Sequence, residues 1–201
     1  MNDTLFTIGL TQTLCAAPAA EARAAFVRSG ALLSRPGIDA GLLGGLQRAA
    51  ASAGFVSDPV VDLGHRWIER PHKVGAAVEV ALARRPLLDW LEAVTGCGAI
   101  THLEGRLVQT RAGGEDGLVW HADTADRMVL GLTLHLFDCA YEGGEFDIRD
   151  ARSKVPTFHH ARARGGDVVV FDIDTRFEHR VAPVLSGQPR TVFTGWFVNG
   201  R

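Results

Sequence analysis

The chain has 201 residues, of which 46% are hydrophobic and 22% are charged, and its formal net charge is −2. This length and composition are typical of one globular domain, and they exclude both a disordered chain and a small fold that depends on disulfides. Because the net charge is slightly negative, the sequence also argues against a protein that binds nucleic acid through a basic surface.

The first part of the chain carries mainly helical patterns. Short strands are predicted near residues 5–10 and 31–34, and residues 38–54 place leucines and alanines at the i, i+3, i+4 spacing of a helix. Residues 73–95 have the same spacing, and Pro86 divides them into two predicted helices. Between the helical patterns, residues 55–72 are predicted to be irregular, because prolines and a glycine interrupt them.

The second part of the chain changes to the alternating pattern of β-strands, with glycine pairs between the runs. The predicted strands cover residues 103–111, 117–123, 127–137, 144–148, 154–160, 167–172, 178–184 and 189–198. Many short strands without helices between them favour a jelly-roll. We therefore predict an α+β protein with one domain over residues 1–201, in which a mainly helical part, 1–99, packs on a double-stranded β-helix (jelly-roll) core, 100–201.

Neither the cysteines nor the hydrophobic runs indicate export or membrane insertion. Cys15, Cys97 and Cys139 are far apart in the sequence and form no CxxC pair, which favours free thiols in a reducing compartment. No apolar run approaches the ~20 residues of a membrane span. A signal peptide would require basic residues near its start, and no basic residue precedes Arg23. We expect a cytoplasmic protein without a membrane partner, and the sequence leaves its oligomeric state open.

A candidate metal site lies in the predicted strand that ends at residue 123. Because side chains at i and i+2 share one face of a strand, His121 and Asp123 point the same way and can share a cation. A third ligand has to come from elsewhere, and His179 is the candidate. Two histidines and one carboxylate leave coordination positions open, which suits a non-haem Fe(II) oxygenase, although zinc accepts the same ligands.

An arginine follows the second histidine at a distance that suits the same cavity. Residues 178–184 and 189–198 are predicted to form a hairpin through Leu185–Pro189, which would place Arg190 beside His179. A buried guanidinium needs an anionic partner, and a small carboxylate that it can clamp with two hydrogen bonds is the natural one.

The order of these motifs points to a known family. The motifs are His121-x-Asp123, Gly143-Gly144-Glu145-Phe146, Gly166-Asp167 with Val168–Phe171, His179-x-Val181-x-Pro183-Val184, Arg190 and Trp196. Over about residues 100–198 the chain resembles the prolyl 4-hydroxylase-like branch of the Fe(II)- and 2-oxoglutarate-dependent oxygenases. The resemblance implies a dioxygenase that uses Fe(II), 2-oxoglutarate as co-substrate and O₂, with ascorbate as a further candidate.

The resemblance also implies roles for individual residues. His121, Asp123 and His179 would bind Fe(II) as the catalytic centre, Arg190 would bind the second carboxylate of the co-substrate, and Trp196 would wall the site. Because Asp123 keeps the carboxylate that a halogenating branch lacks, hydroxylation of an unactivated C–H is favoured. The substrate stays open between a free amino acid, a peptide or protein side chain and a small metabolite.

One family position differs in this chain. On the strand before the His-x-Asp pair, relatives often carry a tyrosine that contacts the co-substrate, whereas the nearest equivalent here is Arg111, with Gln109 on the same face. We therefore expect Arg111 at the co-substrate site. Arg127 and His135 share one face of the next predicted strand, and both are candidate substrate contacts.

Two other functions compete with this hypothesis. A cupin-like β-sandwich that binds a metal or a sugar without catalysis would not need Arg190. Nucleic-acid demethylation by a related branch would require a second arginine six residues after the first, and Trp196 occupies that position.

Overall fold

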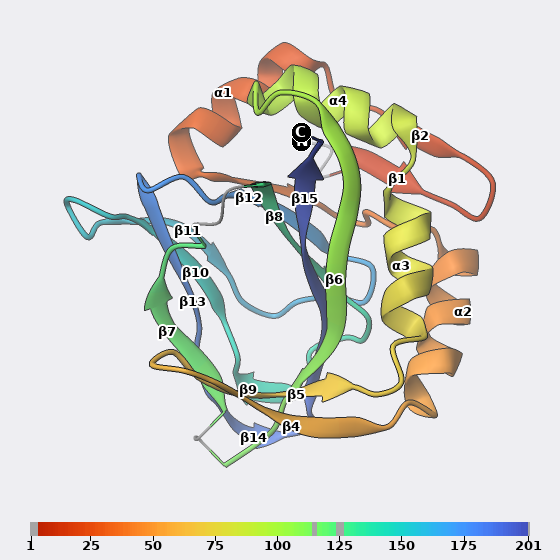
Figure 1. The fold of residues 1–201 in the computed structure, drawn as a ribbon, viewed down its shortest axis with the longest axis vertical. Helices are drawn as coiled ribbons and strands as arrows, with labels where there is room; N and C mark the ends of the chain where they lie inside the picture. The colour runs from red at the N-terminus through yellow and green to blue at the C-terminus, as the bar shows by residue number, and fades with distance from the viewer. Residues whose placement is uncertain (1–3, 114–115, 124–126, 201) are drawn as a thin grey trace.

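The computed structural model describes residues 4–113, 116–123 and 127–200, and it has an α+β architecture in which helices cover one side of a nearly closed, twisted pair of sheets (Figure 1). The helices are α1 (Ala19–Ser29), α2 (Ala40–Ala51), α3 (Val74–Leu82) and α4 (Arg85–Thr95). The strands are β1 (Phe6–Ile8), β2 (Thr13–Cys15), β3 (Ala31–Ser34), β4 (Phe55–Val60), β5 (Gly64–Glu69), β6 (Ile100–Thr110), β7 (Gly117–His121), β8 (Met128–His135), β9 (Tyr141–Gly143), β10 (Phe146–Asp150), β11 (Pro156–His160), β12 (Val168–Asp172), β13 (Phe177–Val181), β14 (Val184–Gly187) and β15 (Arg190–Asn199).

The strands form two facing sheets that are continuous at one edge. The smaller sheet has the order β11-β10-β13-β7, and the larger one has the order β5-β6-β15-β8-β12-β3, with β4 beside β5. The antiparallel pairing of β7 with β5 joins the two sheets. The predicted double-stranded β-helix with helices packed on it is therefore confirmed.

Alternation along β15 separates the cavity from the core. Arg190, Val192 and Trp196 share one face of the strand and line a cavity between the sheets. Phe193 and Phe197 point the other way, and both are fully buried in the cluster that the larger sheet forms with the helices. In Figure 1, α2 and α3 lie beside this outer face and α1 and α4 lie across the top of the molecule. The helices thus pack on the outer face of the larger sheet, and its inner face lines the cavity.

The helix predictions agree with the structure where capping residues are present. Asp39 begins α2 by accepting a hydrogen bond from the backbone N–H of Leu42 at 2.8 Å. Pro86 lies in the first turn of α4, and Gly96 ends this helix in the left-handed conformation with φ 73°. The predicted break of residues 73–95 into two helices is therefore confirmed.

Two segments differ from the prediction. Residues 55–72, predicted to be irregular, contain the hairpin of β4 and β5. Pro59 is tolerated because β4 pairs only with β5 and is an edge strand, so its missing N–H breaks no second ladder. The helix α1 was not predicted, since only Ala22 and Phe26 of its eleven residues are buried and the apolar stripe is too short to stand out.

The two parts of the chain share one sheet. β3, β4 and β5 come from residues 1–99 and pair with one another or with strands of the second part, as in the pairing of β3 with β12.

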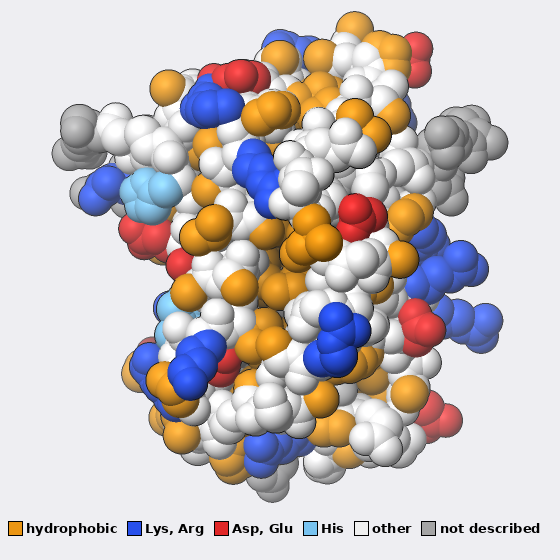
Figure 2. Space-filling view, turned by 90° about the vertical axis from the view of Figure 1, so that its right-hand side faces the viewer, with side chains coloured by type: hydrophobic (Ala, Val, Ile, Leu, Met, Phe, Trp, Pro, Cys, Tyr) orange, Lys and Arg blue, Asp and Glu red, His pale blue; other side chains and the backbone are white. Residues whose placement is uncertain are grey.

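On the face that carries α2 and α3, acidic and basic side chains are interspersed with apolar ones (Figure 2). Within the described ranges, no helix is long and apolar enough to cross a membrane.

A buried ionic cluster ties the first part of the chain to the second. Arg35 donates to both carboxylate oxygens of Asp167 at 2.8–3.1 Å, and His160 lies 3.1 Å from the same carboxylate. The side chain of Asp167 is only 1% exposed. Burial raises the pKa of Asp167, but the hydrogen bonds from His160 and Arg35 outweigh it and hold this pKa well below its ordinary value.

We predict that Asp167→Asn lowers the free energy of unfolding by about 3–5 kcal/mol, because it removes the charge of a buried carboxylate that accepts hydrogen bonds from Arg35 and from the backbone N–H of Arg164. Since the folded-state pKa of Asp167 is depressed, its stabilisation is complete above the ordinary pKa near ~3.9 and is lost as the pH falls below it. Urea unfolding at pH 7 and at pH 3 measures both effects. Asp62→Asn, an exposed position with φ 60°, is the matched control and should change little.

Candidate metal centre

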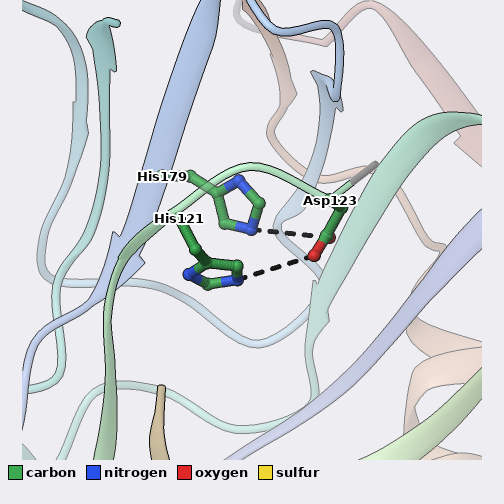
Figure 3. Close-up of side chains that lie close together, drawn as sticks. All are labelled: His121, Asp123 and His179. Atoms are coloured by element: carbon green, nitrogen blue, oxygen red, sulfur yellow. Dashed lines mark ion pairs between the residues drawn. The ribbon is translucent and has the colours of Figure 1, made fainter. Parts of the chain in front are cut away.

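Strand pairing brings the three predicted ligands together. His121 is the last residue of β7, and His179 lies directly opposite it in β13. Asp123 follows two residues after His121, just beyond the end of the strand. The Nε2 atoms of His121 and His179 lie 3.6 and 3.5 Å from the two carboxylate oxygens of Asp123. Figure 3 shows both imidazole rings directed toward this carboxylate.

The spacing of these atoms fits a shared ion. One ligand atom from each of the three residues lies within 4.8 Å of the others. Ligand atoms that each lie ~2.1 Å from one ion are about 3–3.5 Å apart, which agrees with the two histidine–carboxylate distances. Because the three residues approach from one side and also line a cavity, the other side is open to further ligands. The donor set therefore fits the Fe(II) that the resemblance implies.

The surroundings keep the histidines ready to bind a metal. Burial lowers the pKa of His179 to about 4, so its imidazole is neutral near pH 7, as a metal ligand must be. The rings of Phe171 and Phe146 pack against it at centroid distances of 4.8 and 5.8 Å. Nδ1 of His121 lies 2.7 Å from the backbone carbonyl oxygen of Val119, and this contact turns Nε2 toward the site.

Trp196 holds the carboxylate ligand in place. Its Nε1–H donates to Oδ2 of Asp123 at 2.7 Å, and its ring lines the cavity. Trp196 thus lines the cavity, as expected, and also donates a hydrogen bond to a candidate metal ligand.

Arg190 lies in the same cavity, which has a volume of about 160 Å³. The residue is only 2% exposed, and its Nε and Nη2 have no hydrogen-bond partner among the residues that the structure describes. Burial lowers the pKa of Arg190, because the charged guanidinium is withdrawn from water. A buried cation with free donors fits a carboxylate that enters the cavity.

The predicted hairpin between His179 and Arg190 is not present. β13 pairs with β10 and β7, whereas β15 pairs with β6 and β8, so the two residues belong to different sheets. The intervening residues form β14, which pairs with β9 instead. His179 and Arg190 nevertheless line the same cavity, because the two sheets face each other.

Arg111 is placed differently from the expectation. Its guanidinium stacks over the ring of Trp67 at 3.6 Å, and Gln109 also lies outside the cavity. Val108 and Thr110, the other face of the same strand, line the cavity instead. The expectation assumed the opposite face of β6, which the sequence alternation alone does not distinguish.

The two candidate substrate contacts are also outside the cavity lining. Arg127 is exposed at the start of β8. His135 is 2% exposed and lies against His160, with a ring-centroid distance of 5.0 Å. Burial lowers the pKa of His135 well below its ordinary value, and the nearby charge of Arg190 adds to this effect.

Tyr141 is a residue of the site that the sequence did not reveal. It is the only tyrosine in the chain. A side-chain carbon built at Gly144 would meet the ring of Tyr141 at 2.9 Å and the side chain of Arg190 at 3.1 Å, so these two side chains flank the glycine. Its place in the sequence offered one signal, because Tyr141 lies three residues before Gly144 of the Gly143-Gly144 pair.

Five further histidines have structural partners. Each lies within 3.3 Å of a carboxylate oxygen. The pairs are His65–Asp116, His72–Glu79, His102–Glu104, His159–Asp147 and His160–Asp167.

Comparison with known families supports this description of the site. Residues 107–198 match the family model of the 2OG-Fe(II) oxygenase superfamily. This segment contains the three candidate ligands, Arg190 and Trp196. No curated protein sequence matches the chain.

Solved structures share the fold. A Pseudomonas putida prolyl-4-hydroxylase is 18% identical, with a TM-score of 0.67, over 92% of this chain and 100% of its own. A Trichoplax adhaerens prolyl hydroxylase, in complex with a hypoxia inducible factor peptide fragment, is 15% identical, with a TM-score of 0.67, over 90% of this chain and 88% of its own. The epimerase SnoN, in complex with Fe³⁺, alpha ketoglutarate and nogalamycin RO, is 16% identical, with a TM-score of 0.61, over 90% and 83%.

We predict that His179→Ala and Asp123→Ala each weaken Fe(II) binding at least about 100-fold, because two remaining ligands hold the ion poorly. Anaerobic calorimetric titration with Fe(II) measures the change. His159→Ala, which removes an exposed histidine bonded to Asp147, is the control and should bind as the wild type does. Unchanged affinity in both ligand variants would contradict the site.

Trp196→Phe should weaken Fe(II) binding by about 10- to 100-fold, because it removes the hydrogen bond to Asp123 and keeps most of the ring. The same titration measures this effect. Circular dichroism of the variant should match the wild type, and a wild-type affinity would mean that the 2.7 Å contact does not orient the ligand.

Proposed function

We propose, from the match of residues 107–198 to the 2OG-Fe(II) oxygenase superfamily, that His121, Asp123 and His179 bind the iron of such an enzyme and that Arg190 binds its co-substrate. The protein is a 2-oxoglutarate-dependent dioxygenase with a prolyl 4-hydroxylase-like fold. Its cofactor is Fe(II) and its co-substrate is 2-oxoglutarate.

One observation carries the assignment of Arg190. A buried guanidinium with two unpartnered nitrogens, among the described residues, faces the same cavity as the three candidate ligands. Because 2-oxoglutarate has a carboxylate at each end, one end can reach the metal ligands while the other binds Arg190. Tyr141 lies beside Arg190 and can orient the guanidinium or add a hydrogen bond to the same carboxylate.

We propose that the enzyme hydroxylates an unactivated C–H bond. In the balanced reaction, 2-oxoglutarate, O₂ and the substrate R–H give succinate, CO₂ and R–OH. The bound iron supplies the activation of O₂. The protein positions and insulates the reactants: Asp123 keeps the third ligand position filled, and Phe146 and Phe171 exclude water beside His179.

The substrate proposal is limited to compounds that reach a small, enclosed site. SnoN was solved with a natural product and the Trichoplax enzyme with a peptide, so the shared fold accommodates both kinds of ligand. A cavity of about 160 Å³ is smaller than the ~300–1,000 Å³ of pockets that bury drug-sized ligands. We propose a small molecule or a single projecting side chain as the substrate. Family membership argues against the cupin-like, non-catalytic alternative.

An anaerobic titration tests the proposed co-substrate site. Fe(II) followed by 2-oxoglutarate should produce a visible charge-transfer band in the wild type. Arg190→Ala should raise the Kd for 2-oxoglutarate about 100-fold, since it removes the cation that faces the far carboxylate, and should leave the Kd for Fe(II) unchanged.

Arg190→Lys is the matched variant, because it keeps the positive charge but loses the two-pronged geometry, and it should fall between the wild type and Arg190→Ala. Succinate formation under air, with and without candidate substrates, measures turnover. Wild-type affinity of Arg190→Ala for 2-oxoglutarate would overturn the assigned role of this arginine.

A further inference from the structure

A second arginine shares the inner face of the larger sheet. Arg106 lies in β6 and is two and four residues before Val108 and Thr110, which both line the cavity. Since alternate residues of a strand share a face, its side chain leaves the sheet on the same side. Its cross-strand neighbour in β15 is Thr194, which also lines the cavity.

Arg106 has no acidic partner in the described part of the chain, where no carboxylate oxygen lies within the 4.0 Å of an ion pair. The acids around it are already engaged. Asp58 accepts a hydrogen bond from Arg66 at 2.8 Å, and Glu104 lies 2.7 Å from Nε2 of His102. Among the described residues, these two acids therefore form their close contacts with other side chains and none with the guanidinium of Arg106.

Burial and charge both act against an unpaired cation here. Arg106 is half-buried, and burial lowers its pKa; repulsion from Arg66 and Arg70 lowers the pKa further, while the charge of Asp58 acts in the opposite direction. Its one aromatic contact is with the ring of Trp196, whose centroid lies 6.0 Å from the guanidinium carbon. A cation–π contact at this distance compensates only a small part of the lost hydration. An anionic ligand group would compensate the rest.

Trp196 connects Arg106 to the candidate metal ligands. Arg106 contacts the ring of Trp196, and the Nε1–H of this ring donates a hydrogen bond to Asp123. It is separate from the co-substrate arginine. Arg190 and Thr194 are four residues apart in β15, which corresponds to about 13 Å along the strand. The two guanidinium groups can therefore bind two different carboxylates, on either side of the metal ligands.

From this arrangement we infer that Arg106 binds a carboxylate of the substrate, and that the substrate is a small carboxylic acid, such as a free amino acid, rather than an internal residue of a peptide. The inference rests on the proposed function and narrows its substrate class. An internal peptide residue carries no backbone carboxylate, whereas a small acid bound at Arg106 extends its carbon chain toward Asp123. Arg106 is thus a specificity-determining residue.

The test uses the holoenzyme with Fe(II) and 2-oxoglutarate under anaerobic conditions. The probes are the twenty free L-amino acids and the straight-chain mono- and dicarboxylic acids of four to eight carbons, each compared with its amide. Binding is read from the change that each probe causes in the charge-transfer band. At least one acid should change the band at concentrations where its amide does not.

Arg106→Gln should weaken binding of that acid roughly 10- to 100-fold, as expected for the loss of a charge-assisted hydrogen bond, and should leave binding of the amide unchanged. Arg106→Lys should restore part of the affinity. Arg176→Gln is the matched control, because it removes an exposed arginine outside the cavity lining. The guanidinium carbon of Arg176 lies 4.7 Å from the ring centroid of Phe177. It should behave as the wild type does.

Three results would overturn the inference while leaving the proposed function intact. They are no acid of the panel binding, acids and amides binding equally, and Arg106→Gln weakening 2-oxoglutarate instead of the acid. A wild-type protein that forms no charge-transfer band would overturn the proposed function itself, and with it this inference. The wild-type titration without probes therefore separates the two failures.

Discussion

The pairing of β7 with β13 is the constraint on which the site depends. It places His121 and His179 opposite each other although 58 positions separate them in the chain. Neither strand alone carries a complete ligand set, and Asp123 completes it from the segment that follows β7. A shift of one residue in this pairing would turn one histidine to the outer face of the sheet, so the register of two short strands decides whether the centre exists.

The rest of the fold keeps that register fixed. The helices bury the outer face of the larger sheet. The ion pair between Arg35 and the buried Asp167 links the residue after β3 to the residue before β12. On the inner face, Gly131 leaves room for the ring of Phe171, since a side-chain carbon there would lie 2.2 Å from it. Phe171 in turn packs on His179. Core packing and the candidate metal centre are thus parts of one continuous structure.

Much of this could be predicted from the sequence, because the informative patterns are local or ordered along the chain. Alternation predicted most of the strands, and proline and glycine marked the helix ends. The order of the motifs pointed to the three candidate ligands, Arg190 and Trp196, which all line one cavity. Which strands pair was not predictable, so the hairpin between His179 and Arg190 was wrong even though both residues do line one cavity. The face of β6 was also ambiguous, so Arg111 was expected at the co-substrate site, whereas Val108 and Thr110 line the cavity and Arg111 stacks on Trp67. Tyr141 escaped notice because its neighbour in space, Arg190, is 49 positions away.

The burial of Arg190 has a consequence for the lifetime of the protein. A buried guanidinium whose Nε and Nη2 have no hydrogen-bond partner among the described residues destabilises the folded chain when no ligand is bound. A ligand that binds only the folded state adds a stabilisation that grows with its concentration. With Arg190 in its proposed role, the resistance of the enzyme to unfolding and to proteolysis therefore rises with the concentration of 2-oxoglutarate.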